Sequence, residues 1–281
     1  DRTAEKPPSQ FSPTALPLGD YLSPVRVLPY STANGCWWRK CAFCPEKAEG
    51  QPYRPLPSEF IRKDLQRLSD EMGHGLIHFL DDALAPRFLE RMIDHPPGAP
   101  WYGFARITHH LADPAFAEGL KASGCVMLKL GIESGDQTVL DALHKGTRVE
   151  MASKVLTNLK AAGINVYAYL LFGTPAETEA AARRTLDWTL AHSECIDFLN
   201  LAVFNLPAYS PEARALRTQS FYPGDLSLYA DFEHPHGWQR HKVRRFLDSV
   251  FKKPAPIRKI LINDPPHFTS NHAPFLVMAA Q

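Results

Sequence analysis

The fold is decided by residues 126–172, which read VMLKLGIESGDQTVLDALHKGTRVEMASKVLTNLKAAGINVYAYLLF. Apolar runs at 126–130 and 164–172 have the length and composition of buried strands. Between them lies a segment of helical character, of which 152–162 is the clearest part and Gly163 is the stop signal. Two strands joined through helices predict a parallel βαβ unit with a right-handed crossover.

The same alternation continues on both sides of this stretch. Further apolar runs predict strands at residues 76–80, 101–105 and 196–204. Asp113 before Pro114 predicts the start of a helix that ends at Gly124. Ser134 and Thr174 each stand three residues before a Gln or Glu, in the spacing of a capping box, and the second helix should run to about His192. About five or six such units form an α/β fold, either an open sheet or a partial barrel.

Polar residues and glycines follow the predicted strands. They are Asp81 and Asp82, Arg106, residues 131–134, and residues 173–174. Parallel strands place their carboxyl ends at one edge, where α/β proteins bind their ligands. We therefore expect these residues to surround the functional site.

Composition places the chain among ordinary folded proteins. Of its 281 residues, 44% are hydrophobic and 22% charged, which is near the globular average and excludes a disordered chain. At about 150 residues per domain, this length corresponds to roughly two domains or one barrel. The 31 basic and 30 acidic residues leave a net charge of +1, so no broad positive field attracts nucleic acid. No run of residues has the length and hydrophobicity of a membrane helix.

A cysteine-rich loop follows the apolar residues 25–29. Residues 34–45 read NGCWWRKCAFCP, with Cys36, Cys41 and Cys44 inside nine positions. The chain has five cysteines and no signal peptide at its start, so we expect a reducing cytoplasm, where such a cluster favours a metal over a disulfide. Three alternatives stay open: a zinc ion, which wants a fourth ligand; three unrelated core thiols; and a 4Fe–4S cluster with one iron free. The last is favoured, because three ligands leave a position open for chemistry.

This loop resembles the cluster loop of the radical S-adenosylmethionine (SAM) superfamily, including the aromatic Phe43 before the last cysteine. Residues 131–134, 136–146 and 171–178 resemble the segments after the fourth and fifth strands of its partial (β/α)6 TIM-like barrel. One departure is that four residues, rather than the usual three, separate the first two cysteines. We interpret this as a longer loop around an intact cluster.

The resemblance implies that Cys36, Cys41 and Cys44 bind a 4Fe–4S cluster whose free iron chelates SAM. Reductive cleavage of SAM then gives a 5′-deoxyadenosyl radical, which abstracts a substrate hydrogen. The residues that the resemblance places around SAM are Phe43, Leu171 and Gly173 at the adenine, Glu133 and Ser134 at the ribose or amino group, Arg106 at the carboxylate, and Asp81 and Asp82 at the amino group.

Each of these residues also has a purely structural interpretation. The alternatives are a helix cap for Ser134 and for one of the two aspartates, a surface or structural ion pair for Arg106, core packing for Leu171 and Phe172, and buried core thiols for Cys125 and Cys195. The histidines in residues 231–241, together with His267 and His272, fit loop positions better than a metal site.

We expect three parts along the chain. Residues 1–24 form a proline-rich N-terminal segment, residues 25–206 form the barrel with its cluster loop at 34–45, and residues 207–281 form an irregular C-terminal extension that closes the barrel. Residues 21–24 and 237–275 resemble the superfamily branch that often carries an N-terminal cobalamin-binding domain.

This branch implies methyl transfer as the leading reaction. The chain starts without Met and contains no Asp-x-His-x-x-Gly motif, so we expect cobalamin, where it is used, in an upstream domain or another chain. Two alternatives stay open: a cobalamin-independent radical SAM enzyme, and a non-catalytic, metal-stabilised interaction module. The expected partners are a small-molecule or peptide substrate and a reductant such as flavodoxin or ferredoxin; neither a membrane nor a nucleic acid is expected.

Overall fold

The centre of the protein is a curved parallel sheet. The computed structural model describes residues 16–73, 75–221, 228–265 and 269–279. Six strands are ordered β1-β4-β5-β6-β7-β8, and every neighbouring pair is parallel. They are β1 (Val27–Tyr30), β4 (Leu76–Leu84), β5 (Trp101–Ala105), β6 (Cys125–Glu133), β7 (Asn165–Phe172) and β8 (Phe198–Val203). The predicted α/β partial barrel is confirmed.

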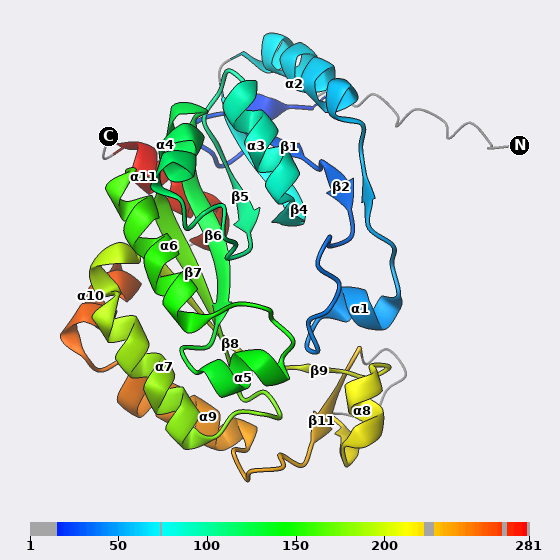
Figure 1. Ribbon diagram of the computed structural model, residues 1–281, viewed down its shortest axis with the longest axis vertical. Helices are drawn as coiled ribbons and strands as arrows, with labels where there is room; N and C mark the ends of the chain where they lie inside the picture. Colours follow the sequence, from blue (N-terminus) through cyan, green and yellow to red (C-terminus); the bar gives the residue numbers. More distant parts are fainter. Residues whose placement is uncertain (1–15, 74, 222–227, 266–268, 280–281) are drawn as a thin grey trace, which may run out of the picture.

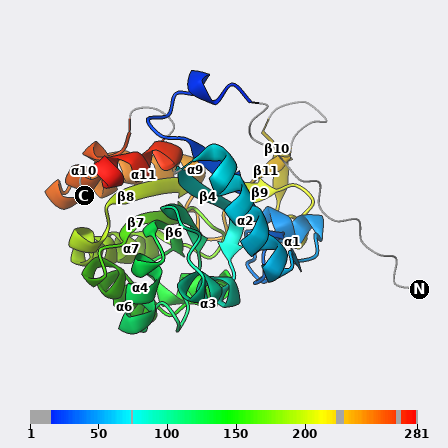
Figure 2. The same cartoon turned by 90° about the horizontal axis from the view of Figure 1, so that it is seen from above.

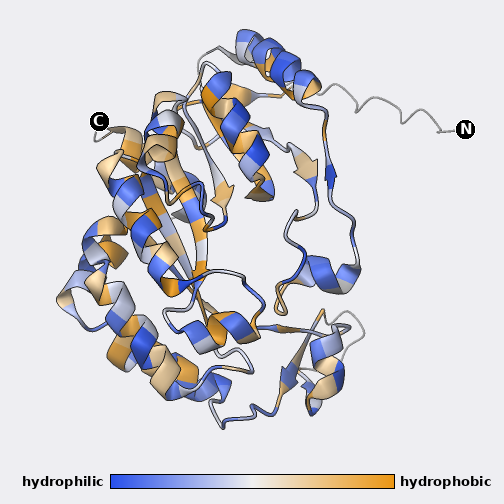
Figure 3. Ribbon diagram, viewed as in Figure 1, coloured by the Kyte–Doolittle hydropathy of each residue, from blue (hydrophilic) through white to orange (hydrophobic). Residues whose placement is uncertain are grey.

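Amphipathic helices cover the convex face of the sheet (Figures 1 and 2). They are α2 (Ser58–Met72), α3 (Pro86–Asp94), α4 (Pro114–Ala122), α6 (Val149–Ala161) and α7 (Glu179–Ala191). The strands are largely hydrophobic, and the helices carry both hydrophobic and hydrophilic residues (Figure 3). Alternate strand residues, such as Leu128 and Leu130 of β6, join the core between sheet and helices. The residues between them face the inside of the barrel.

The concave face is covered at the amino ends of the strands by α11 (Thr269–Ala279), which lies on the opposite side of the sheet from α4 and α6 (Figure 2). Ala273 and Val277 of this helix form a second core with Leu76, Met127 and Tyr167 of the strands. The interior of the barrel is therefore closed at this end.

Shorter elements gather beyond the carboxyl ends of the strands (Figure 1). They are α1 (Pro45–Glu49), α5 (Gln137–Ala142), α8 (Pro211–Ala215), the pair β2 (Ala33–Asn34) and β3 (Arg54–Pro55), and the sheet of β9 (Leu206–Pro207), β10 (Thr218–Ser220) and β11 (Tyr229–Phe232). Single 3-10 turns lie before β1 (Leu18–Asp20) and before β8 (Ser193–Cys195).

The C-terminal extension is more regular than expected. It contains α9 (Arg240–Phe246), a π-helical turn (Leu247–Phe251), α10 (Ala255–Ile262) and α11. Within the described part of the chain, none of the helices has the length and hydrophobicity needed to span a membrane.

Both predicted capping boxes are wrong. Helix α5 begins at Gln137 with Asp136 as its cap, whose carboxylate accepts from the Val139 N–H. Helix α7 begins at Glu179 with Thr178 as its cap, and it ends at Ala191, close to the predicted end at about His192. By contrast, Asp113 caps α4 as expected. Helices α5 and α7 begin later than predicted because Ser134 and Thr174 are held in turns by tertiary contacts, Ser134 with Thr185 and Thr174 with His234.

Candidate active site

The three loop cysteines lie between β2 and α1 and form no disulfide in the structure. Cys44 is the N-cap of α1, so its thiol lies beside the backbone N–H groups of the first turn of this helix. Burial raises the pKa of Cys44, these N–H groups lower it, and the charges of Cys41 and Cys36 raise it. The three thiols are therefore close enough to influence one another.

Trp38 and Ala42 explain the long spacing between Cys36 and Cys41. The indole N–H of Trp38 donates to the carbonyl of His144 at 3.0 Å, and the Ala42 N–H donates to the carbonyl of Leu143 at 2.9 Å. The extra residue lets the loop cross to residues 143–146, which follow α5, and bind them.

Trp38 lies directly against Gly146. The backbone of Gly146 has a φ of +67°, and a Cβ added there would lie 2.2 Å from Cζ2 of the indole. We expect Gly146→Ala to displace the cluster loop, because both the left-handed backbone and the ring oppose a side chain. Reduced iron incorporation after anaerobic reconstitution would be the readout. Gly50→Ala, also at positive φ but with open space around it, is the matched control; equal iron content in both variants would contradict the role of the contact.

Arg106 joins the cluster loop to the barrel. It is 7% exposed and directly follows β5. Its Nη1 lies 3.5 Å from Sγ of Cys41, and its Nη2 donates to the carbonyl of Lys145. The guanidinium also lies over the ring of Trp38, at 4.4 Å from the centroid. Arg106 is not at the surface, so that part of its structural interpretation is wrong; its pairing with the SAM carboxylate stays a prediction.

A buried ion pair follows at the end of β6. Nζ of Lys145 lies 2.8 Å from Oε1 of Glu133, and both side chains are largely buried. Glu133 has a φ of +65°, an uncommon conformation that is often held at functional sites. Gly131 gives the pair its space, since a Cβ there would lie 2.6 Å from the Glu133 carboxylate. A side chain at position 131 would therefore crowd the ion pair between Glu133 and Lys145.

Aromatic and apolar residues surround this ion pair. The ammonium of Lys145 stands 5.5 Å from the ring centroid of Phe43. Phe43 in turn packs against the small cluster of Phe204 and Leu206, to which Leu171 also belongs. The structure therefore brings Cys41, Phe43, Arg106, Glu133 and Leu171 to one end of the barrel.

Lys145 connects these residues and was not identified from the sequence. It sits in the quoted segment 136–146, but nothing in that segment distinguishes it from a surface lysine. Only the folded chain shows it buried, with a carboxylate on one side and the cluster loop on the other.

The two aspartates of β4 have different surroundings. The strand runs through them to Leu84, further than predicted, and α3 begins after Ala85 without a side-chain cap, so the capping interpretation is wrong. Asp81 is buried and accepts from the backbone N–H and hydroxyl of Thr32, at 3.0 and 2.6 Å. Asp82 is exposed. The pKa of Glu46 in α1 is raised, first by the burial of Glu46 itself and then by the charge of Asp82. Asp82 is therefore the one that borders the cluster loop.

Ser134 and Gly173 lie beside α7 and the extension. The hydroxyl of Ser134 is buried and lies 3.0 Å from that of Thr185. Gly173, at a φ of +78°, donates its N–H to Oε2 of Glu177. Contacts of both residues with SAM stay predictions.

Glu177 is a second residue that sequence analysis did not single out. It is fully buried, and Oε2 also accepts from the indole N–H of Trp238 at 2.9 Å. Oε1 has no hydrogen-bond partner among the described residues. Burial raises the pKa of Glu177 to about 7, although the two hydrogen bonds from Gly173 and Trp238 lower it.

The stability of the protein should fall with rising pH because of Glu177. Its folded pKa of about 7 exceeds the ordinary glutamate pKa of 4.5, so its contribution is full below pH 4.5 and is lost as the pH rises through 7. The loss is about 3 kcal/mol as an order of magnitude. Urea unfolding at pH 5 and pH 8 measures it. In Glu177→Gln this decrease should disappear, whereas exposed Glu179→Gln should retain it; an unchanged decrease in Glu177→Gln would contradict the assignment.

The remaining cysteines and histidines form no further site in the part of the chain that the structure describes. Cys125 is fully buried, as predicted, but Cys195 is only half-buried. Nε2 of His234 donates to the carbonyl of Thr174, which gives this histidine a structural role. His267 lies outside the described residues.

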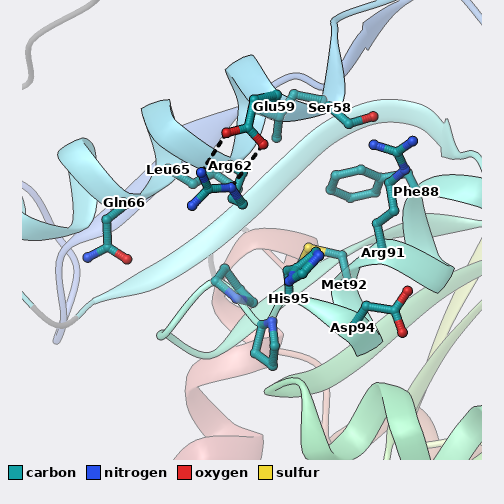
Figure 4. A pocket seen from close by; sticks show the side chains of 13 residues that line it. Ser58, Glu59, Arg62, Leu65, Gln66, Phe88, Arg91, Met92, Asp94 and His95 are labelled. Atoms are coloured by element: carbon teal, nitrogen blue, oxygen red, sulfur yellow. Dashed lines mark hydrogen bonds and ion pairs between the residues drawn. The ribbon is translucent and has the colours of Figure 1, made fainter.

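A groove of about 380 Å³ lies outside the barrel, between α2 and α3 (Figure 4). The ion pair between Arg62 and Glu59 lies along it. Its lining contains none of the residues predicted to contact a cofactor.

The cysteine loop fits an iron–sulfur cluster better than a single metal ion. Among the described residues, no three His, Cys, Asp or Glu side chains are arranged around one ion. In a 4Fe–4S cluster each cysteine binds a different iron, so the thiolates stand further apart than ligands of one ion. The Arg106 donor at Cys41, and the position of Cys44 at the N-terminus of α1, suit anionic sulfur. The residues present therefore fit the cluster.

The fold and this loop define a barrel protein with a three-cysteine loop at the carboxyl ends of its strands. A family model described as the radical SAM superfamily matches residues 30–189, which is more than half of the chain. The chain belongs to the radical SAM superfamily, which uses a 4Fe–4S cluster and SAM. This family was predicted from the sequence and is confirmed.

The chain is similar to parts of longer curated proteins. It is 26% identical over 211 residues to the anaerobic magnesium-protoporphyrin IX monomethyl ester cyclase of Cereibacter sphaeroides, covering 72% of this chain and 33% of the relative. It is 22% identical over 173 residues to the bacteriochlorophyllide d C-12(1)-methyltransferase of Chlorobaculum tepidum, covering 59% of this chain and 38% of the relative. The chain thus spans about a third of the length of these relatives.

Two solved structures have the same fold. OxsB, a cobalamin-dependent SAM radical enzyme, superposes with a TM-score of 0.64 at 16% identity, over 89% of this chain and 46% of OxsB. TsrM is a radical SAM methyltransferase from Kitasatospora setae, in a structure with cobalamin and a 4Fe–4S cluster bound. It superposes with a TM-score of 0.58 at 19% identity, over 68% of this chain and 37% of TsrM. These neighbours match the predicted cobalamin-linked branch in fold.

Proposed function

We propose that this chain is the catalytic barrel of a cobalamin-dependent radical SAM methyltransferase that acts on a small molecule or peptide. The observation that carries the proposal is the series of contacts from Cys41 through Arg106 and Lys145 to Glu133. It joins the cysteine loop to the strand-end residues across one end of the barrel. A loop that only stabilised a binding module would not need a buried, charged connection to those residues.

The roles of the residues follow from their positions. Cys36, Cys41 and Cys44 hold the cluster, which, when bound together with SAM, supplies a 5′-deoxyadenosyl radical from reductive cleavage of SAM. Arg106 orients Cys41 and presents further N–H donors to a carboxylate. Phe43 and Leu171 provide apolar walls, and Glu133 and Asp82 provide carboxylates for a cationic amine.

The rest of the chain shields this site. We assign the barrel to residues 25–206 and the part that completes it to residues 207–281. The extension is attached at the end of β7 through Trp238 and His234, which bind Glu177 and Thr174. Excluding water and stray hydrogen donors suits radical chemistry.

Methyl transfer and cobalamin are supported by the names of the neighbours and relatives, and these proteins are longer than this chain. We assign cobalamin to a domain or chain beyond residues 1–281. A reducing protein such as flavodoxin or ferredoxin would supply the electron, and the clustered cysteines favour a reducing cytoplasm.

Anaerobic reconstitution with iron and sulfide tests the proposal. We expect about four irons and four sulfides per chain, a visible spectrum that changes when SAM is added, and formation of 5′-deoxyadenosine with a strong reductant. With cobalamin and substrate present, S-adenosylhomocysteine should also form. Bound zinc, or a cluster that SAM does not perturb, would favour the non-catalytic module; 5′-deoxyadenosine with no cobalamin dependence would favour a cobalamin-independent enzyme.

A further inference from the structure

A lysine inside the barrel has no acidic partner among the described residues. Lys129 of β6 is 2% exposed, and its Nζ lies 3.3 Å from Nε2 of His78. It also stands over the rings of Tyr102 and Phe104, at 4.9 and 5.2 Å from their centroids. Burial lowers the pKa of Lys129 to about 8, so the ammonium is still the main form at neutral pH.

His78 accepts one of the three N–H groups of the Lys129 ammonium. Burial, and then the charge of Lys129, lower the pKa of His78 to about 3, so its ring is neutral. The ring is stacked on Tyr102 at 4.2 Å, and its Nε2 accepts one N–H of the lysine. Among the described residues, the other contacts of the Lys129 ammonium are with the rings of Tyr102 and Phe104. A buried ammonium is expensive unless an anion compensates it.

The residues on the two sides of Lys129 differ in burial. Toward the amino ends of the strands, Met127 and Tyr167 are buried under α11. Toward the carboxyl ends, Phe104 and Tyr169 are half-buried, and Leu80, two residues beyond His78, is 49% exposed. Lys129 therefore lies between the side chains packed under α11 and the half-buried aromatic side chains nearer the carboxyl ends of the strands.

We propose that Lys129 is the binding site for a carboxylate group of the substrate, whose hydrocarbon part packs against Phe104 and Tyr169. A carboxylate satisfies the free ammonium donors, and the aromatic walls accommodate the apolar atoms next to it. This inference rests on the proposed function, because it specifies the substrate that enters the same barrel. Lys129 lies four residues before Glu133 along β6, roughly 13 Å away, so it does not itself belong to the SAM site.

The test uses phenylacetate as the probe and phenylacetamide as its neutral analogue. We expect calorimetry to show that the reconstituted chain binds phenylacetate more tightly than the amide. Lys129→Met should weaken phenylacetate binding about tenfold or more and leave amide binding unchanged, because a charge-assisted hydrogen bond is lost. Exposed Lys154→Met is the matched control and should bind as the wild type does.

Two further readouts distinguish a carboxylate site from a purely structural role of Lys129. Lys129→Met should retain its thermal stability, its iron content and abortive SAM cleavage, because it removes an uncompensated charge from a site remote from SAM. Equal binding of phenylacetate by the wild type and Lys129→Met, or a collapse of thermal stability in the variant, would overturn the carboxylate site. Failure of the wild type to cleave SAM would instead overturn the proposed function.

Discussion

Replacing Cys41 by Ser should abolish cluster assembly. Cys41 is 7% exposed, is the middle of the three cysteines in the loop, and is the thiol that receives the Arg106 N–H. A serine hydroxyl ionises far less readily than a thiol and is a poor ligand for iron, so only two cysteines would remain. We expect iron and sulfide after anaerobic reconstitution to fall by about tenfold and 5′-deoxyadenosine formation to be lost.

Cys195→Ser is the matched control for this experiment. Cys195 is a half-buried thiol far along the chain from the loop and is assigned no ligand role. Its variant should keep the iron content and the visible spectrum of the wild type. If Cys41→Ser retained full iron, or if Cys195→Ser lost it, the assignment of the three loop cysteines would have to be abandoned.

Lys145→Met should be the most destabilising change in the SAM region. The substitution preserves length but leaves the buried Glu133 carboxylate without its ammonium, on a backbone already held at a φ of +65°. Breaking one half of a buried ion pair costs about 3–5 kcal/mol. Urea unfolding measures this cost, and the SAM-induced change of the cluster spectrum should disappear as well.

Two variants make this prediction specific. Lys252→Met breaks the pair with Asp248, which has the similar distance of 2.7 Å but lies exposed on the surface, and should cost under about 1 kcal/mol. The double variant Lys145→Met with Glu133→Gln should recover part of the stability, because the unpaired charge is gone, but should still not respond to SAM. Equal losses of unfolding free energy in Lys145→Met and Lys252→Met would show that the buried ion pair stabilises the protein no more than the exposed one.

The sequence predicted the strands and the residues at their ends well, because both depend on local patterns. Apolar runs such as residues 164–172 have few alternatives to a buried strand, and parallel strands must bring their carboxyl ends together. Arg106 and Glu133 could therefore be selected before any contact was known. Their actual contacts depend on how the cluster loop crosses the barrel, which no local pattern encodes.

The errors have a common physical cause. Ser134 and Glu177 fit capping boxes locally, but Thr185 and Trp238, which are 51 and 61 residues away in sequence, bind their side chains. Tertiary hydrogen bonds of this kind override local capping preferences. Lys145 was missed for the same reason, since its burial exists only once residues 143–146 meet the cysteine loop.

The anchoring of the cysteine loop also dictates an order of assembly. Trp38 and Ala42 are held by carbonyl groups 106 and 101 residues further along the chain, and Cys41 by an arginine 65 residues further along. The loop can therefore take its shape only after β5, β6 and α5 have come together. We therefore expect a cluster bound by this loop to be delivered late in the maturation of the protein, onto a barrel that has already folded.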